Sequence, residues 1–128
     1  MKKFGLALVF MFAAVAGSYV FANTLTVVDS AFTTAIVDRQ PESRATEFSK
    51  NVEKIYYWTK IEGAKEATTV KHIWYSGDKV IHEMALKVTT PSFRTWSNKT
   101  LYPGLSDLAV EVVDADGKVL KRDTFTIK

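Results

Sequence analysis

The sequence predicts an all-β protein: a single antiparallel β-sandwich of immunoglobulin-like type, with seven to eight strands, after an N-terminal signal or anchor helix. Two observations predict this fold class. Short runs rich in Val, Ile, Thr, Tyr, Phe and Trp alternate in polarity with a period of two, which is typical of half-buried strands. Turn signals recur about every ten residues, a spacing that favours a sandwich over an α/β fold.

Length and composition indicate one globular domain. The chain has 128 residues, of which 47% are hydrophobic and 24% charged. If the first 22 residues serve export, about 106 residues remain, which is enough for one domain with one core. We therefore predict a signal peptide or uncleaved membrane anchor at residues 1–22 and a β-sandwich domain at residues 23–128.

The N-terminal segment has the parts of a secretory signal. Lys2 and Lys3 precede an uncharged apolar run, and Val20 and Ala22 supply the −3 and −1 residues of a cleavage site. Residues 4–22 are also long enough to cross a bilayer, so an uncleaved anchor is the alternative. Both readings place the domain outside the cytoplasm. The predicted location is periplasmic or secreted, or anchored in the inner membrane and facing the periplasm.

The first strands are predicted around a long polar connection. Residues 24–29 alternate polar and apolar side chains, and residues 31–37 form a second apolar run. Residues 55–61 are rich in aromatic and β-branched side chains and end before a glycine. Because residues 38–54 are polar, we predict a connection there, with room for one helical turn near residues 45–48.

The rest of the chain predicts two hairpins and a short strand between them. Residues 68–75 and 79–89 flank a Ser-Gly-Asp turn, and residues 108–114 and 118–128 flank an Asp-Gly turn. Prolines bound the short strand at residues 94–99. These runs complete the set expected for a sandwich.

Charge and cysteine content exclude several classes of protein. The formal charge is +3, but without the two lysines of the predicted signal fifteen Lys and Arg residues face fourteen Asp and Glu residues. The two signs alternate along the chain instead of forming a basic stripe, so nucleic acid is not a predicted partner. The sequence has no cysteine, which removes disulfides, thiol nucleophiles and cysteine-ligated metals. No cofactor is predicted.

Five motifs follow one another in a set order. They are residues 38–41 (DRQP), 55–58 (IYYW), 72–77 (HIWYSG), 93–100 (FRTWSNKT) and 110–120 (VEVVDADGKVL). With them the chain resembles the bacterial family called domain of unknown function 2914, and the Arg-x-Trp-Ser-x-Lys block is the most specific piece. Members often have Gly-x-Trp before the closing strand pair, where residues 103–108 here have leucine instead. The resemblance implies an extracytoplasmic, sandwich-like module and no known activity.

The predicted ligand-binding residues come from two strands. They are His72, Trp74, Arg94, Trp96, Ser97 and Lys99. Arg94 and Trp96 share one strand face, and Ser97 and Lys99 share the other. A guanidinium recognises carboxylate, phosphate or sugar hydroxyl groups, and an indole offers a stacking plane. In the structural alternative, Trp96 fills the core and Arg94 pairs with a loop acid such as Asp38 or Glu42.

His72 and Trp74 are two residues apart and therefore share a strand face. His82 lies on an otherwise apolar face of the next strand. Two histidines and a carboxylate can bind a metal, but three or four ligands are needed and two are visible. We therefore predict no metal site, and expect each histidine to be half-buried and hydrogen-bonded within the sheet.

Two other patterns have a structural and a functional interpretation. Six aromatic residues can form a sugar-binding face if two rings are exposed and coplanar, and otherwise pack in the core; they are Tyr56, Tyr57, Trp58, Trp74, Tyr75 and Trp96. Asp114 and Asp116 resemble part of a calcium loop, but position 123 is Asp123 where an EF-hand has glutamate, so a turn is predicted.

The predicted function is an exported, non-enzymatic binding or accessory module of the bacterial cell envelope. An envelope saccharide or a protein is the favoured partner, with N-terminal membrane anchoring as an alternative to release. A second hypothesis is a structural or assembly component that pairs through its sheet edges. A third is a weak hydrolase or metal-dependent activity around His72, for which Ser97 and an aspartate would have to assemble in space. No nucleophile-elbow, phosphate-loop or zinc-protease motif occurs, so an enzyme is not predicted.

Overall fold

The computed structural model describes residues 24–128, and the signal peptide or anchor predicted at residues 1–22 lies outside the described residues. The described part consists of strands, turns and loops, with no helix among them. The protein is therefore all-β in this part, as predicted. It follows that residues 24–128 contain no helix long and apolar enough for a membrane span.

Seven long strands and three short ones make up the described residues. The long strands are β1 (Thr26–Thr33), β5 (Lys54–Glu62), β6 (Thr68–Ser76), β7 (Lys79–Val88), β8 (Ser92–Thr100), β9 (Leu108–Val113) and β10 (Val119–Ile127). The short strands are β2 (Ile36–Val37), β3 (Gln40–Pro41) and β4 (Glu47–Phe48). The predicted runs from residue 55 onward agree with β5 to β10. The two runs predicted before residue 38 are instead one strand, β1, followed by β2.

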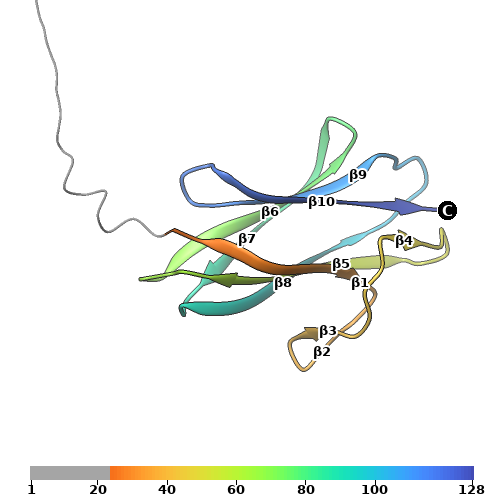
Figure 1. The fold of residues 1–128 in the computed structure, drawn as a ribbon. Helices are drawn as coiled ribbons and strands as arrows, with labels where there is room; N and C mark the ends of the chain where they lie inside the picture. Colours follow the sequence, from red (N-terminus) through yellow and green to blue (C-terminus); the bar gives the residue numbers. More distant parts are fainter. Residues whose placement is uncertain (1–23) are drawn as a thin grey trace, which may run out of the picture.

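The long strands form two sheets that lie as two layers (Figure 1). One sheet has three strands in the order β1-β5-β8, and the other has five in the order β4-β10-β9-β6-β7. Neighbouring strands are antiparallel except β4, which runs parallel to β10. The small β2-β3 sheet lies beside the three-stranded sheet, on the side away from the other layer.

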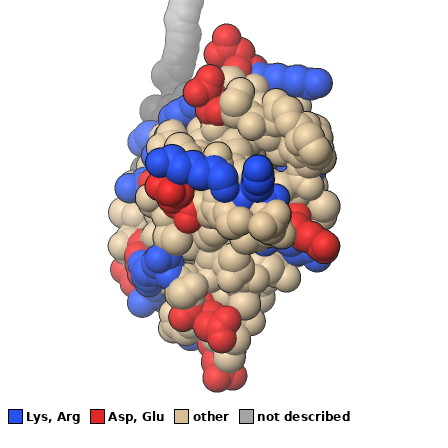
Figure 2. All heavy atoms as spheres, turned by 90° about the vertical axis from the view of Figure 1, so that its right-hand side faces the viewer, with Lys and Arg blue, Asp and Glu red and all other residues tan. Residues whose placement is uncertain are grey.

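The core fills the space between the two sheets. Alternate side chains of facing strands point into it; they include Phe32, Ile55, Tyr57, Ile61, Val70, Trp74, Val110, Val112 and Phe125. The Phe32 ring lies 4.6 Å from the Phe125 ring and 4.9 Å from the Tyr57 ring, centroid to centroid. Each buried side chain of this size contributes about 1.5–3 kcal/mol. Charged residues of both signs are scattered over the face that Figure 2 shows.

Residues 38–54 differ most from their prediction. The β2-β3 hairpin turns at Asp38 and Arg39, both with positive φ, as a two-residue hairpin with matching twist requires. The helical turn considered at residues 45–48 is wrong. The amide of Ala45 donates to the carbonyl of Phe32 at 3.2 Å, and Glu47–Phe48 pairs with β10. These residues are extended because they exchange hydrogen bonds with two strands.

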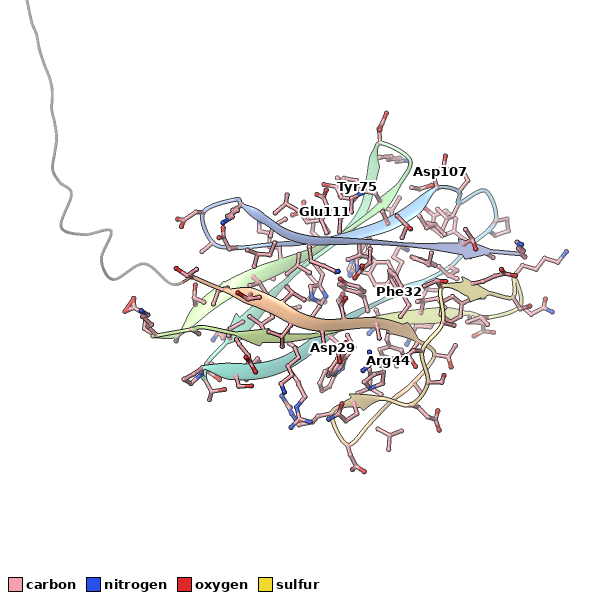
Figure 3. The ribbon with its side chains drawn as sticks, viewed as in Figure 1. Asp29, Phe32, Arg44, Tyr75, Asp107 and Glu111 are labelled. Carbon is pink, nitrogen blue, oxygen red and sulfur yellow. The ribbon has the colours of Figure 1, made fainter. Side chains whose placement is uncertain are left out.

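The β2-β3 hairpin and the residues after it cover the outer face of the three-stranded sheet. Trp58 lies on this face, yet is only 1% exposed because this segment covers it, and its indole N–H donates to the carbonyl of Arg39 at 2.9 Å. Arg44 also covers the indole and binds the carboxylate of Asp29 through two hydrogen bonds of 2.8 Å (Figure 3). The guanidinium holds the pKa of Asp29 below its ordinary value. This cover sets the boundary of the site described below.

Gly63 provides a test of the junction between β5 and β1. Its φ is +104°, and a Cβ there would collide with the backbone carbonyl of Thr24. We expect Gly63→Ala to lower the free energy of unfolding by about 3 kcal/mol or more, because backbone strain and the collision add. The matched variant Gly77→Ala has positive φ but open space, and should cost about 1 kcal/mol. Equal losses in urea denaturation would contradict this account.

Candidate ligand-binding site

Three of the six predicted ligand-binding residues lie in the interior. His72 and Trp74 on β6 are 0% exposed, and Ser97 on β8 is 2% exposed. The indole N–H of Trp74 donates to the hydroxyl of Ser97 at 3.0 Å. The same hydroxyl lies 2.7 Å from Nδ1 of His72. The three side chains therefore form a polar link between the two sheets.

The remaining contacts of His72 define its tautomer. Nε2 lies 3.2 Å from the hydroxyl of Thr59, which donates to the carbonyl of Thr95 at 3.1 Å. Nε2 must then be the donor, and the hydroxyl of Ser97 must donate to Nδ1, because only this assignment pairs every donor with an acceptor. The chain of donors runs from Trp74 through Ser97 to His72, and from His72 through Thr59 to Thr95. In residues 24–128 no buried side-chain polar atom is left without a partner.

This network is closed to solvent and electrically neutral. Burial lowers the pKa of His72 to about 3, so the imidazole is uncharged at neutral pH. The contact between Ser97 and His72 resembles that of a nucleophile and its base. However, the second nitrogen of His72 contacts Thr59 instead of a carboxylate, and Ser97 is out of reach of an external molecule. We therefore interpret these three side chains as structural and leave them out of the proposed site.

Arg94, Trp96 and Lys99 lie at the surface but do not form one group. Arg94 and Trp96 are half-buried on the outer face of the three-stranded sheet. Lys99 is near the end of β8, where its ammonium donates to the carbonyl of Thr100 at 3.0 Å and lies 5.0 Å from the Tyr102 ring centroid. Along β8 it lies five positions after Arg94, about 17 Å away in an extended strand. The structure therefore keeps Arg94 and Trp96 together and leaves Lys99 apart.

The structural alternative considered for this block is wrong on both points. Trp96 does not fill the core; the guanidinium of Arg39 lies over its ring, 5.3 Å from the centroid. Arg94 forms no ion pair with Asp38 or Glu42. Instead its backbone carbonyl accepts a hydrogen bond of 2.7 Å from Nη2 of Arg39. The side chain of Arg94 is left without a carboxylate partner in the described structure.

Three cations share the outer sheet face with Trp96 or lie over it, and we call Arg39, Lys60, Arg94 and Trp96 the cationic face. Lys60 is the cross-strand partner of Arg94. Like charges directly opposite each other destabilise a sheet. The acid nearest to Lys60 among its ion pairs is Glu62 at 3.9 Å, and both side chains are exposed, so this pair neutralises little. On its other side Lys60 is in register with Asp29 of β1, which partly balances its charge. Arg39 and Arg94 form no ion pair within the described residues, so the positive charge of the cationic face comes mainly from these two guanidinium groups.

Sequence reasoning missed two members of the cationic face. Lys60 has a signal in the sequence, because it alternates with Trp58 in an aromatic run and therefore shares its face. No local pattern places Arg39 in this group, because only the folded β2-β3 hairpin brings its side chain against β8. Its left-handed backbone, φ 63°, and its contacts with two rings of β8 are tertiary features.

The other candidate motifs have structural roles. One carboxylate oxygen of Asp114 accepts from the amides of Asp116 and Lys118, each at 2.9 Å, which is the predicted turn. Tyr57, Trp58 and Trp74 are buried, and the ring pairs of the described residues are tilted or edge-to-face, not coplanar. Within residues 24–128, no three His, Asp or Glu side chains gather where they can hold a metal ion.

Comparison with known families finds a match in the second half of the chain. The model of the family described as protein of unknown function (DUF2914) matches residues 67–127. This range holds strands β6 to β10, and so includes the buried His72 and Ser97 as well as Arg94 and Trp96. No curated protein matches the chain significantly.

Removal of the Ser97 hydroxyl tests the buried network. Ser97→Ala leaves the indole N–H of Trp74 and Nδ1 of His72 unpaired in the core, which should lower the free energy of unfolding by about 2–3 kcal/mol. Ser92→Ala is the matched control, since this residue is exposed on the same strand and should change stability by less than about 0.5 kcal/mol. Similar values for the two variants in chemical denaturation would refute the network.

The buried imidazole makes stability depend on pH. Its folded-state pKa of about 3 is below the unfolded value of 6.5, so the unfolded chain binds the proton more readily. The contribution is complete above pH 6.5 and is lost as the pH falls towards 3, at about 1.4 kcal/mol per unit. Between pH 6 and 4.5, denaturation of His72→Gln should lack this slope. A variant with the slope of the parent protein would contradict the burial argument.

Proposed function

The chain belongs to the DUF2914 family through residues 67–127, and from this premise we propose that it is an exported, non-enzymatic binding or accessory module of the bacterial cell envelope. Residues 1–22 would direct export or anchor the chain in the inner membrane, and the domain would work in the periplasm or outside the cell. The two facing sheets support an immunoglobulin-like sandwich as the finer description of the domain.

We further propose that the cationic face is the binding surface. The observation that carries this proposal is the pairing of Lys60 with Arg94 across two strands, with no carboxylate on Arg94. An anion bound between the two side chains relieves their repulsion, and a guanidinium can hold a carboxylate or phosphate through two parallel hydrogen bonds. The chemistry therefore favours a ligand that carries such a group.

The ring of Trp96 narrows the ligand class. The ring is half-buried, with the Arg39 guanidinium over one face, and its exposed part can pack against the C–H groups of a sugar. A saccharide that carries carboxylate or phosphate groups combines both contacts. We propose an anionic envelope saccharide as the ligand. The burial of His72 and Ser97 supports binding over catalysis, because the nucleophile–base contact lies out of reach of this ligand.

A thermal-shift and calorimetric screen tests the proposal. The probes are muropeptides, which carry carboxylates, then inorganic phosphate, and a neutral chito-oligosaccharide. At one hundred times its Kd a ligand adds about 2.7 kcal/mol of stability, which raises the melting temperature of a domain this small by several degrees. We expect the anionic saccharide to bind and the neutral one to bind at least tenfold more weakly.

Two charge variants locate the site. Arg94→Ala should abolish the shift, whereas Lys118→Ala removes the same charge from the β9-β10 turn and should retain it. Equal binding of neutral and anionic saccharides, or equal loss in both variants, would refute the cationic face. A flat screen on a folded protein would turn the proposal towards a protein partner.

A further inference from the structure

We propose that the unpaired edge of β10 at residues 122–124 accepts an extended segment of a partner protein as an additional strand, in line with β4. This edge belongs to the five-stranded sheet, and the inference rests on no part of the cationic face. The occupant is a peptide because the contacts on offer are backbone amides and carbonyls at strand spacing.

The chain itself shows this binding mode further along the same edge. The amide of Thr126 donates to the carbonyl of Thr46 at 2.8 Å, and the amide of Lys128 donates to the carbonyl of Phe48 at 2.9 Å. Through these bonds β4 lies parallel to the end of β10. Strand β4 has only two residues, so the edge before Thr126 is left unpaired.

Alternation along β10 identifies the free groups. Amides and carbonyls of successive residues point to opposite edges of a strand. Because Thr126 faces β4, Phe125 and Asp123 face β9, where they are in register with Leu108 and Val110. Thr124 and Arg122 therefore direct their backbone groups to the open edge. No backbone partner for them occurs in the described structure.

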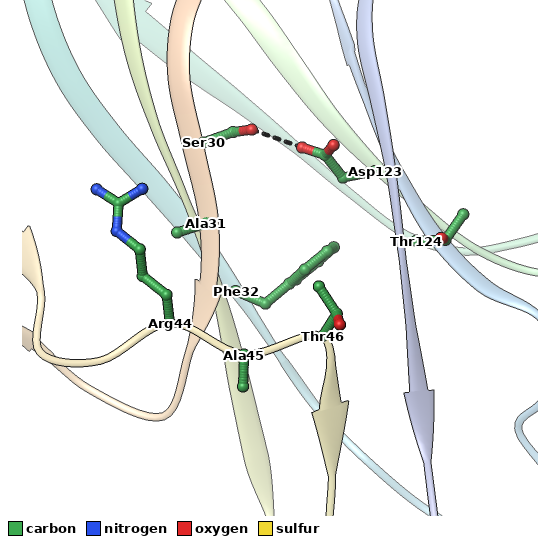
Figure 4. Close-up of a pocket in the computed structure, with 8 residues that line it drawn as sticks. All are labelled: Ser30, Ala31, Phe32, Arg44, Ala45, Thr46, Asp123 and Thr124. Atoms are coloured by element: carbon green, nitrogen blue, oxygen red, sulfur yellow. Dashed lines mark hydrogen bonds between the residues drawn. The ribbon is translucent and has the colours of Figure 1, made fainter.

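A hollow adjoins this open edge (Figure 4). Its volume is about 390 Å³, and its lining comes from β1, the chain before β4, and β10. In the view of Figure 4 the chain at Arg44 to Thr46 passes across it from β1 towards β10. An added strand turns alternate side chains towards the hollow and towards solvent. The hollow thus gives room for side chains on one side of the occupant.

Strand β1 does not close this edge, although it lies beside β10. The two are joined through side chains: the hydroxyl of Ser30 donates to Asp123 at 2.6 Å, and the hydroxyl of Tyr57 donates to the same carboxylate oxygen at 2.7 Å. The amide of Ala45 already donates to the carbonyl of Phe32, which is the last of the β1 residues that line the hollow. Side-chain hydrogen bonds therefore hold β1 beside β10, while the backbone groups of Arg122 and Thr124 on β10 stay unpaired.

Hydrogen exchange on the intact protein tests the proposal directly. The probe is a blocked ten-residue peptide selected from a random displayed library on the immobilised protein. The amides of Arg122 and Thr124 should exchange fast in the free protein and at least tenfold more slowly with saturating peptide. The amides of Asp123 and Phe125, paired with β9, should be protected in both states. Unchanged rates at residues 122 and 124, protection on the edge of β7 instead, or selection of no peptide would overturn the inference.

A proline variant tests the same amide by affinity. Thr124→Pro removes the amide that the added strand needs, and no ladder bond to β9 is lost, because proline is accepted on an edge whose N–H faces outward. Peptide affinity should fall at least tenfold, whereas Thr124→Val, which keeps the amide, should bind as the parent protein does. Equal affinity of Thr124→Pro would overturn the inference. If this variant does not fold, the exchange measurement on the parent protein decides alone.

Discussion

The hydroxyl of Ser97 fixes the relation between the two sheets. It accepts from Trp74 and donates to His72, so one small side chain of β8 satisfies two large side chains of β6. Another relative position of β6 and β8 would leave part of this network unpaired in the core, and a half-satisfied buried network costs more free energy than an apolar core. A slip of β8 by one residue would expose Ser97 and bury its neighbours. The network therefore also sets the face on which Arg94 and Trp96 are displayed.

The choice of which alternate side chains of β8 face the core explains what the sequence predicted and what it did not. The period-two pattern placed the long strands from β5 to β10 and separated Arg94 and Trp96 from Ser97. Which side faced the core was not predictable from residue type, since tryptophan is apolar and serine is polar. The core side contains Ser97 because His72 and Trp74 bring a buried acceptor and a buried donor that need a partner.

Residues 38–48 show a second limit of sequence reasoning. Their polar composition predicts a connection between strands. Yet the carbonyl of Arg39 accepts a hydrogen bond from the indole N–H of Trp58, and the amide of Ala45 donates to the carbonyl of Phe32. Such contacts depend on which part of the folded domain the loop packs against, and the local sequence pattern contains no information about this tertiary placement. The cover over Trp58, the third cation of the cationic face and strand β4 all come from this segment.

The same segment separates the two surfaces proposed for binding. On the outer face of the three-stranded sheet it contributes Arg39, and at the hollow beside β10 it contributes Ala45 and Thr46. The two surfaces belong to different sheets: the cationic face lies on β5 and β8 of the three-stranded sheet, and the open edge of β10 belongs to the five-stranded sheet. They share no hydrogen bond or ion pair, so substitutions in one should act additively with substitutions in the other. A measured coupling between Arg94 and Thr124 would therefore have two physical routes. One is residues 39–46, which contact both surfaces, and the other is the pair of hydrogen bonds from Ser30 and Tyr57 to Asp123, the neighbour of Thr124.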